Sequence, residues 1–187
     1  PQIGDARWDL YNHIAPSDLS RTTVSEGILQ VIDLWTDRTV RFYREGTSLA
    51  PGSSATIEVR VKVISAVTPS PGYLGFGIST GLQEAKVGLW PDKVGIKAKG
   101  DDFFRTVPAD LTEFRTMRLA VLGSALPVYQ LWLEDRMLFE GQLGSSDRAG
   151  GIYFGMSPGG EPTGVAWWDY VAYSKQFLPV PEPASLL

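Results

Sequence analysis

The most constraining feature of this sequence is a strict alternation of apolar and charged residues within positions 55–65. The apolar positions are β-branched and the intervening ones are charged: Ile57, Val59, Val61 and Val63 against Glu58, Arg60 and Lys62. Successive side chains of a β-strand point to opposite faces, so this order places every apolar side chain on one face. The segment is therefore expected to be a strand of an antiparallel sheet with one buried and one solvated face.

Ten further short segments have strand-like patterns: 27–33, 39–43, 73–79, 85–90, 93–97, 115–122, 128–134, 137–142, 151–157 and 165–174. The stretches between them are rich in Pro, Gly, Asp and Ser, the residues that form tight turns. Segments 86–90 and 93–97 are expected to form one hairpin through Pro91-Asp92, and 129–133 and 137–140 a second through 134–136. Helical turns are expected only at 16–21 and 108–114.

Many strands with so little helix predict an all-β fold, a two-sheet antiparallel β-sandwich. A chain of 187 residues with 43% apolar residues is large enough for one such core. Three prolines within 179–183 exclude a central strand there. The predicted organisation is therefore one β-sandwich domain at 1–176 and a Pro-rich C-terminal tail at 177–187.

Charge and composition argue against several function classes. The net charge of -4 is spread along the chain, which disfavours nucleic acid as a partner. The chain has no cysteine, and His13 is its only histidine, so thiolate chemistry is excluded and a serine triad could be built only on His13. The glycines between Gly72 and Gly81 precede no helix, so close strand packing explains them better than phosphate binding.

Two segments resemble the concanavalin A-like (laminin-G-like) jelly-roll superfamily: the hairpin Leu-Trp-Leu-Glu-Asp-Arg-Met-Leu-Phe at 131–139 and the last strand Trp-Trp-Asp-Tyr-Val-Ala-Tyr-Ser at 167–174. The resemblance covers about 8–175 and implies a jelly roll. Where the superfamily commonly has Asp-Gly in the hairpin, this chain has residues 134–136, which allows a longer turn.

Glucanases of this superfamily carry Glu-x-Asp-x-x-Glu on one strand, because alternate residues share a face and reach both sides of a glycosidic bond. This chain lacks the motif, and its nearest pair, Glu134 with Glu140, lies on opposite arms of a hairpin. We therefore expect no enzymatic activity and no catalytic residue.

Calcium is the cofactor that the superfamily resemblance leaves open, because many members bind it in loops. The candidate ligands are Asp33, Asp37, Asp101 and Asp102. No Asp-x-Asp-x-Asp series is present, so solvated turn acids are the preferred interpretation, and no cofactor or metal site is predicted.

Aromatic residues are the remaining candidates for binding. If Trp167, Asp169, Val171 and Tyr173 point inward on the last strand, Trp168 and Tyr170 point outward, and Leu131 and Leu133 inward would place Trp132 outward. Trp90 lies beside a turn. We therefore predict Trp132, Trp168, Tyr170 and Trp90 as a ligand-binding set that stacks on sugar rings. The alternative for each ring is a place in the core or in a second small core.

The tail, Val-Pro-Glu-Pro-Ala-Ser-Leu-Leu at 180–187, is similar to the start of a PEP-CTERM sorting signal, with Pro181, Glu182 and Pro183 as the motif. The resemblance implies processing by an exosortase and a place outside the cell, or at the surface, of a Gram-negative bacterium. The predicted function is a secreted or cell-surface, non-catalytic domain that binds a glycan or exopolysaccharide. The alternative is a structural subunit of an extracellular matrix or filament that self-associates through sheet edges and terminal segments.

Overall fold

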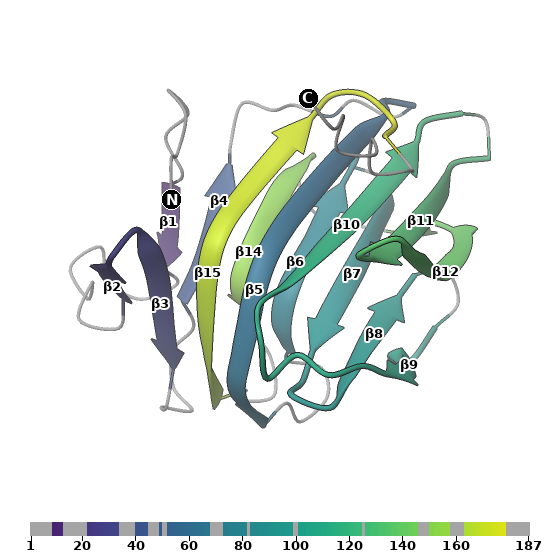
Figure 1. Cartoon of the computed structure of the whole chain (residues 1–187). Coiled ribbons are helices and arrows are strands. Elements are labelled where there is room, and N and C mark those ends of the chain that lie inside the picture. Colours follow the sequence, from purple (N-terminus) through teal and green to yellow (C-terminus); the bar gives the residue numbers. More distant parts are fainter. Residues whose placement is uncertain are drawn as a thin grey trace, which may run out of the picture.

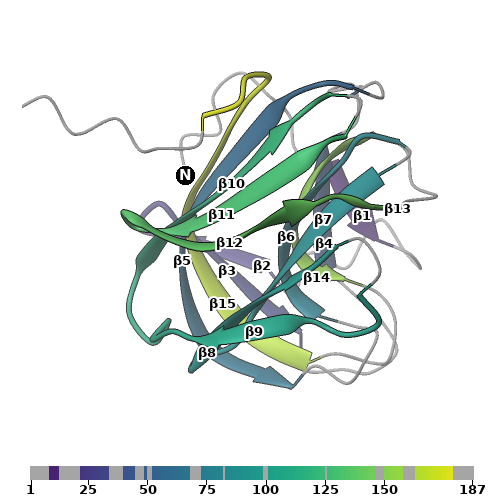
Figure 2. The same ribbon diagram turned by 90° about the vertical axis from the view of Figure 1, so that its right-hand side faces the viewer.

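The computed structural model describes residues 9–12, 22–33, 40–44, 49, 52–67, 73–81, 83–98, 101–124, 126–145, 150–157 and 163–178. Over these ranges the regular structure consists of strands arranged in two antiparallel sheets. The sheets lie face to face as two layers, which is clearest in Figure 2. Within the described ranges no helix is long and apolar enough to span a membrane.

Sheet A, with eight strands, lies behind sheet B in Figure 1. Its order is β1 (Asp9–Asn12), β4 (Val40–Arg44), β14 (Gly151–Ser157), β6 (Tyr73–Ser79), β7 (Gln83–Leu89), β8 (Lys93–Lys97) and β9 (Arg105–Pro108), with β13 (Gly144–Ser145) paired to β7.

Sheet B has seven strands and includes the alternating segment 55–65. Its order is β12 (Arg136–Gln142), β11 (Val128–Leu133), β10 (Arg115–Leu122), β5 (Ala55–Val67), β15 (Thr163–Ser174), β3 (Ile28–Asp33) and β2 (Thr22–Ser25). The longest strands, β5 and β15, pair along almost their whole length at the centre of the sheet.

The core lies between the two sheets and confirms the alternation of 55–65. Ile57, Val59, Val61 and Val63 are at most 1% exposed, whereas Arg60 on the other face is exposed. The opposing layer of sheet A is equally apolar and includes Leu74, Phe76, Ile78, Val87, Leu89 and Ile96. Burial of these side chains from both sheets is the main stabilising contribution to the fold.

All eleven predicted strands are present, and both predicted hairpins are confirmed. The turn of the second hairpin is shorter than the predicted 134–136, because Leu133 pairs with Arg136 and only Glu134 and Asp135 form the turn. Glu134 adopts φ 50°, a left-handed conformation that a two-residue hairpin turn requires.

The prediction of a helical turn at 108–114 is wrong, because these residues form no helix. Pro108 ends β9, and the following residues form a turn in which the backbone N–H of Thr112 donates to the Asp110 carboxylate at 2.9 Å. The Thr112 hydroxyl donates to the same oxygen at 2.6 Å, and these two hydrogen bonds lower the pKa of Asp110. A side chain that bonds to the backbone two residues later favours a turn over a helix. The other expected turn, 16–21, lies outside the described residues.

The last strand, β15, contains a bulge, and some of its side chains therefore lie on the opposite face of the sheet from the one predicted. Trp168 pairs with Val61 of β5, but Tyr170 pairs with Arg60, so Asp169 is an extra residue without a partner on β5. An inserted residue switches the faces of every residue on one side of it. Val171 and Tyr173 therefore pack against the core as predicted, whereas Trp168 points inward and Trp167 outward, contrary to prediction.

Candidate functional site

The four predicted ligand-binding residues do not form one site. Trp168 is 1% exposed and packs in the core against Phe154, with ring centroids 5.0 Å apart, so its predicted outward position is wrong. Trp132 and Tyr170 lie on the outer face of sheet B, as predicted. Trp90 follows β7 and packs on the outer face of sheet A, on the opposite side of the sandwich.

On the outer face of sheet B, Tyr170, Glu58 and Arg118 form one hydrogen-bonded network, whereas the buried Trp132 Nε1 has no partner among the described residues. The Tyr170 hydroxyl donates to one Glu58 oxygen at 2.8 Å, and Arg118 donates to the other from two nitrogens, at 2.9 and 2.5 Å. Burial, followed by the hydrogen bond to Glu58, raises the pKa of Tyr170 to about 12. Because Glu58, Arg118 and Tyr170 satisfy one another's hydrogen bonds, we interpret this network as stabilising sheet B.

The C-terminal segment also lies across sheet B. The Thr56 hydroxyl donates to the Gln176 carbonyl at 2.7 Å and accepts from the backbone N–H of Leu178 at 2.9 Å. The chain therefore stays bonded to the sheet as far as Leu178. Beyond it, the sorting motif Pro181, Glu182 and Pro183 lies outside the described residues.

The outer face of sheet A is built differently, around a row of four glycines. Gly155 of β14 pairs with Gly75 of β6, which pairs with Gly88 of β7, which pairs with Gly95 of β8. These glycines leave a strip of bare backbone across four strands, which is called the trough below. Aromatic rings fill it, because Trp90, Phe104, Tyr73 and Tyr153 pack there outside the main core.

Trp90 is the aromatic ring of this trough that best suits ligand stacking. A Cβ on Gly88 would lie 2.7 Å from Trp90 Cη2, and one on Gly95 would lie 3.1 Å from Trp90 Cζ3, so the ring rests on both glycines. Phe104 supports it edge-on with centroids 5.6 Å apart, and Lys93 Nζ lies 5.3 Å from the ring centroid. Trp90 remains partly exposed, so its ring forms a fixed aromatic surface in contact with solvent, called the Trp90 platform below.

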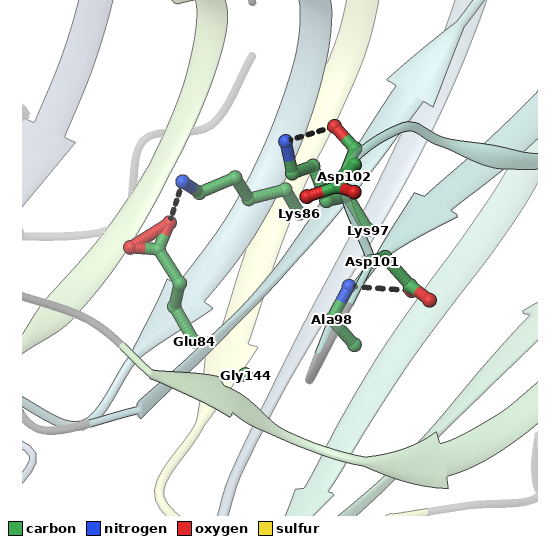
Figure 3. A pocket seen from close by; sticks show the side chains of 7 residues that line it. All are labelled: Glu84, Lys86, Lys97, Ala98, Asp101, Asp102 and Gly144. Atoms are coloured by element: carbon green, nitrogen blue, oxygen red, sulfur yellow. Dashed lines mark hydrogen bonds and ion pairs between the residues drawn. The ribbon is translucent and has the colours of Figure 1, made fainter.

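A pocket of about 280 Å³ opens on the same face, next to the trough (Figure 3). Its lining residues come from β7, β13 and the end of β8 with its following turn: Glu84, Lys86, Lys97, Ala98, Asp101, Asp102 and Gly144. Lys86 lies two residues before Gly88 along β7, and two residues along a strand span about 7 Å. The pocket and the Trp90 platform are thus parts of one continuous surface.

Glu84 is the buried acid of this pocket, at 3% exposure. Lys86 Nζ lies 2.7 Å from Glu84 Oε1, and the Tyr153 hydroxyl donates to the same carboxylate oxygen at 3.5 Å. Tyr73 in turn donates to the Tyr153 hydroxyl at 3.0 Å. The result is a chain of hydroxyl groups that leads to a carboxylate beside a pocket, an arrangement that can accept and return a proton.

The turn after β8 shapes the opposite wall of the pocket. The Asp101 carboxylate accepts from the backbone N–H of Ala98 at 3.0 Å and forms an ion pair with Arg105 Nε at 3.2 Å. Arg105 also donates to the Tyr129 hydroxyl, whose pKa is raised mainly by burial. These bonds fix the turn, and the Phe103 ring within it is 71% exposed.

The calcium candidates do not assemble within the described residues. No group of three Asp, Glu, His or Cys side chains there is arranged to hold a metal ion. Asp101 and Asp102 belong to the turn after β8, as the sequence indicated, whereas Asp37 and His13 lie outside the described residues. The prediction of no metal site, with calcium left open by the superfamily resemblance, stays untested.

No family model matches this sequence, and no curated protein matches it. Solved structures do match. The alginate lyase Aly36B has a TM-score of 0.60 at 12% identity, over 85% of this chain and 85% of its own. The endo-1,3-beta-glucanase from Streptomyces sioyaensis has a TM-score of 0.59 at 12% identity, over 91% of this chain and 90% of its own. The fold is a jelly-roll β-sandwich.

A third similar structure is a chain of botulinum neurotoxin type C, a toxin whose cell entry depends on interaction with two ganglioside molecules. It has a TM-score of 0.55 at 10% identity and covers 91% of this chain and 44% of its own. At such identities the likeness concerns the fold alone. Activity and ligand have to be argued from the residues of this chain.

The comparisons contradict the prediction that the chain is not an enzyme, because this fold is shared with an alginate lyase and an endoglucanase. That prediction depended on the absence of one linear motif and on the apparent scatter of the acids. A search for one linear motif does not find groups that come together only in the folded chain. Glu84 and Lys86 share a strand face, and Asp101 and Asp102 join them through a hairpin, so the groups meet in space without a common motif.

Part of the pocket could have been predicted from the sequence. Glu84 and Lys86 flank Ala85 and precede Val87, an alternation that already placed both charges on one face. The predicted hairpin through Pro91-Asp92 then aligns Lys97 with Lys86. The second small core of Tyr73, Tyr153 and Phe104 could not be found in this way, because it joins β14, β6 and the turn before β9.

Proposed function

We propose that this protein binds a polysaccharide on the outer face of sheet A, along the surface that joins Trp90 to the Glu84 pocket. The observation that carries the proposal is the support of Trp90. Its ring lies on two glycines and is braced by Phe104, next to a pocket lined by charged side chains. Sugar rings present apolar C–H faces to aromatic rings and hydroxyl groups to polar ones, and this surface offers both partners.

The structural neighbours support this proposal at the level of the fold. One is named for alginate, one for a 1,3-β-glucan, and one is described with gangliosides. These two polysaccharides are therefore the first ligands to test. Trp132 and Tyr170 are less suited, because their face of sheet B holds an internally bonded network and the C-terminal segment.

The test uses two tryptophans in similar surroundings on opposite sheets. Trp90 has Lys93 Nζ 5.3 Å from its ring centroid, and Trp167 on sheet B has Lys62 Nζ at 5.6 Å. Trp90→Ala should weaken binding of alginate or soluble 1,3-β-glucan about tenfold or more, the usual effect of truncating a central aromatic contact. Trp167→Ala should leave it unchanged. Calorimetric titrations that gave equal losses for both variants would contradict the proposal.

A second candidate function is cleavage of the bound polysaccharide, and the buried Glu84 favours it. Its carboxylate lines the pocket, where a general acid or base must lie to reach a bound substrate, and the hydroxyl chain from Tyr73 and Tyr153 leads to it. Glu84→Gln removes the titrating group while keeping the size of the side chain. It should abolish release of new chain ends from alginate or 1,3-β-glucan and retain binding.

Tyr153→Phe provides a second variant for this test, should Glu84→Gln destabilise the fold by leaving Lys86 without its carboxylate. It removes one link of the hydroxyl chain and should reduce cleavage at least tenfold. If wild type released no chain ends from a polysaccharide that it binds, or if both variants cleaved it at the wild-type rate, the catalytic candidate would be lost and the binding proposal would remain.

We also propose that the protein acts outside the cell, because Pro181, Glu182 and Pro183 are similar to an exosortase sorting motif. An extracellular or cell-surface location of a Gram-negative bacterium would place the domain beside exopolysaccharide. Self-association through sheet edges stays a prediction. Analytical ultracentrifugation tests it by measuring whether the protein is larger than a monomer.

A further inference from the structure

Two lysines stand side by side on the outer face of sheet A. Lys86 of β7 and Lys97 of β8 are directly paired in the register of the sheet, and both line the pocket beside the Trp90 platform. Figure 3 shows the two ammonium groups near one another, with that of Lys86 directed to Glu84 and that of Lys97 to Asp102. The pocket therefore holds two lysines side by side, together with three acids, and the partners of each group decide which charge meets a ligand.

The partners of the two lysines differ in charge. Lys86 forms an ion pair with the buried Glu84, so its charge is balanced. Lys97 Nζ donates to the backbone carbonyl of Asp102 at 2.6 Å, and a carbonyl carries no net charge. Across the described ranges, no carboxylate lies within ion-pair distance of Lys97. An ammonium group has three donor hydrogens, so Lys97 can still donate to a ligand.

The acids that line the pocket compete with a ligand to different degrees. Glu84 is bonded to Lys86 and Tyr153, and Asp101 is bonded to Arg105 and to the backbone of Ala98. The remaining acid is Asp102, whose side chain is exposed. Its charge opposes an incoming anion, but solvent screens an exposed charge more strongly than a half-buried one. Of these two residues, Lys97 is the less exposed.

We infer that the pocket binds an anionic substituent of a polysaccharide, such as the carboxylate of a uronic acid, with Lys97 as its main partner and Lys86 as the second. The inference rests on the proposed function and narrows it to acidic polysaccharides. A carboxylate on Lys97 would sit about two strand residues from Trp90, so one polymer could contact both. A charge-assisted hydrogen bond of this kind is stronger than a bond between neutral groups.

The experiment compares alginate, a polymer of uronic acids, with the same polymer after its carboxylates have been reduced to alcohols. Wild type should bind alginate at least tenfold more tightly than the reduced polymer. Lys97→Gln should weaken alginate binding about tenfold, the usual effect of losing a hydrogen bond to a charged group. Asp102→Asn should strengthen it severalfold, because the carbonyl that holds Lys97 is kept while the opposing charge is removed.

The control is Lys62→Gln, which removes the same charge from the outer face of sheet B, where Lys62 faces Glu113 at 3.5 Å. It should leave alginate binding within twofold of wild type, and the melting temperature of each variant checks its folding. Equal binding of alginate and the reduced polymer, or equal losses in Lys97→Gln and Lys62→Gln, would overturn the inference and leave the proposed function standing. Failure to bind alginate, reduced alginate and soluble 1,3-β-glucan alike would overturn both.

Discussion

Replacing Trp168 with alanine removes the largest fully buried side chain of the described core. Its ring packs on Phe154 of sheet A, which in turn stacks on Phe42 at 4.8 Å, so the substitution breaks a contact between the sheets. Large-to-small substitution of a buried aromatic costs about 3–5 kcal/mol. Within the described residues the Trp168 Nε1 has no hydrogen-bond partner, and its removal offsets part of this cost.

We therefore expect Trp168→Ala to lower the free energy of unfolding by about 3 kcal/mol. For a chain of this length, 1 kcal/mol corresponds to about 2–4 °C, so the melting temperature should fall by about 6–12 °C. Urea unfolding followed by far-ultraviolet circular dichroism measures the change without relying on tryptophan fluorescence. Trp167→Ala on the outer face should cost no more than about 1 kcal/mol. If Trp167→Ala proved the more damaging of the two, the bulge at Asp169 and the inward position of Trp168 would be refuted.

Three further predictions follow from particular contacts. Gly88→Ala would place a Cβ 2.7 Å from the Trp90 ring, so it should cost about 1–3 kcal/mol in thermal unfolding and weaken polysaccharide binding as Trp90→Ala does. Between pH 10 and 12 wild type should lose stability relative to Tyr170→Phe, because the raised pKa of Tyr170 keeps its proton bound in the folded state after the unfolded state has released it. A shift of two units corresponds to about 2.7 kcal/mol, which solvent screening of this half-buried group reduces to about 1 kcal/mol; urea titrations at pH 9 and 11.5 should show a loss only at the higher pH. Deleting 179–187 should leave the melting temperature nearly unchanged, whereas deleting 176–187 should cost about 1–2 kcal/mol, because it removes both hydrogen bonds to Thr56; equal melting temperatures for the two truncations would contradict this.

The strands that could be predicted are those whose two faces differ in polarity. The alternation within 55–65 identified β5, and turn residues such as Pro91-Asp92 identified the hairpins around it. The four strands that were missed are β1, β2, β9 and β13, which lie at sheet edges or are very short. The exposed side chains of β2 and β9, and Pro108 at the end of β9, give no periodic burial signal.

The face of the sheet on which each β15 side chain lies could not be predicted by counting alternate residues, because a bulge at Asp169 interrupts the alternation. The same limit applies to the candidate site. Counting along one strand finds Glu84 with Lys86, and a hairpin adds Lys97, but the glycine row and the hydroxyl chain depend on the pairing of β14 with β6. Those strands are far apart in the sequence, and their register is fixed by the packing of the whole sandwich.

The most direct test of polysaccharide binding on sheet A is nuclear magnetic resonance of the tryptophan indole groups during a titration with alginate. Single substitutions assign the indole signals of Trp90, Trp132 and Trp167. We expect the Trp90 signal to shift with added polymer, while the signals of Trp132 and Trp167, on the outer face of sheet B, stay in place. Shifts confined to Trp132 and Trp167 would place the ligand on sheet B and contradict the proposed site.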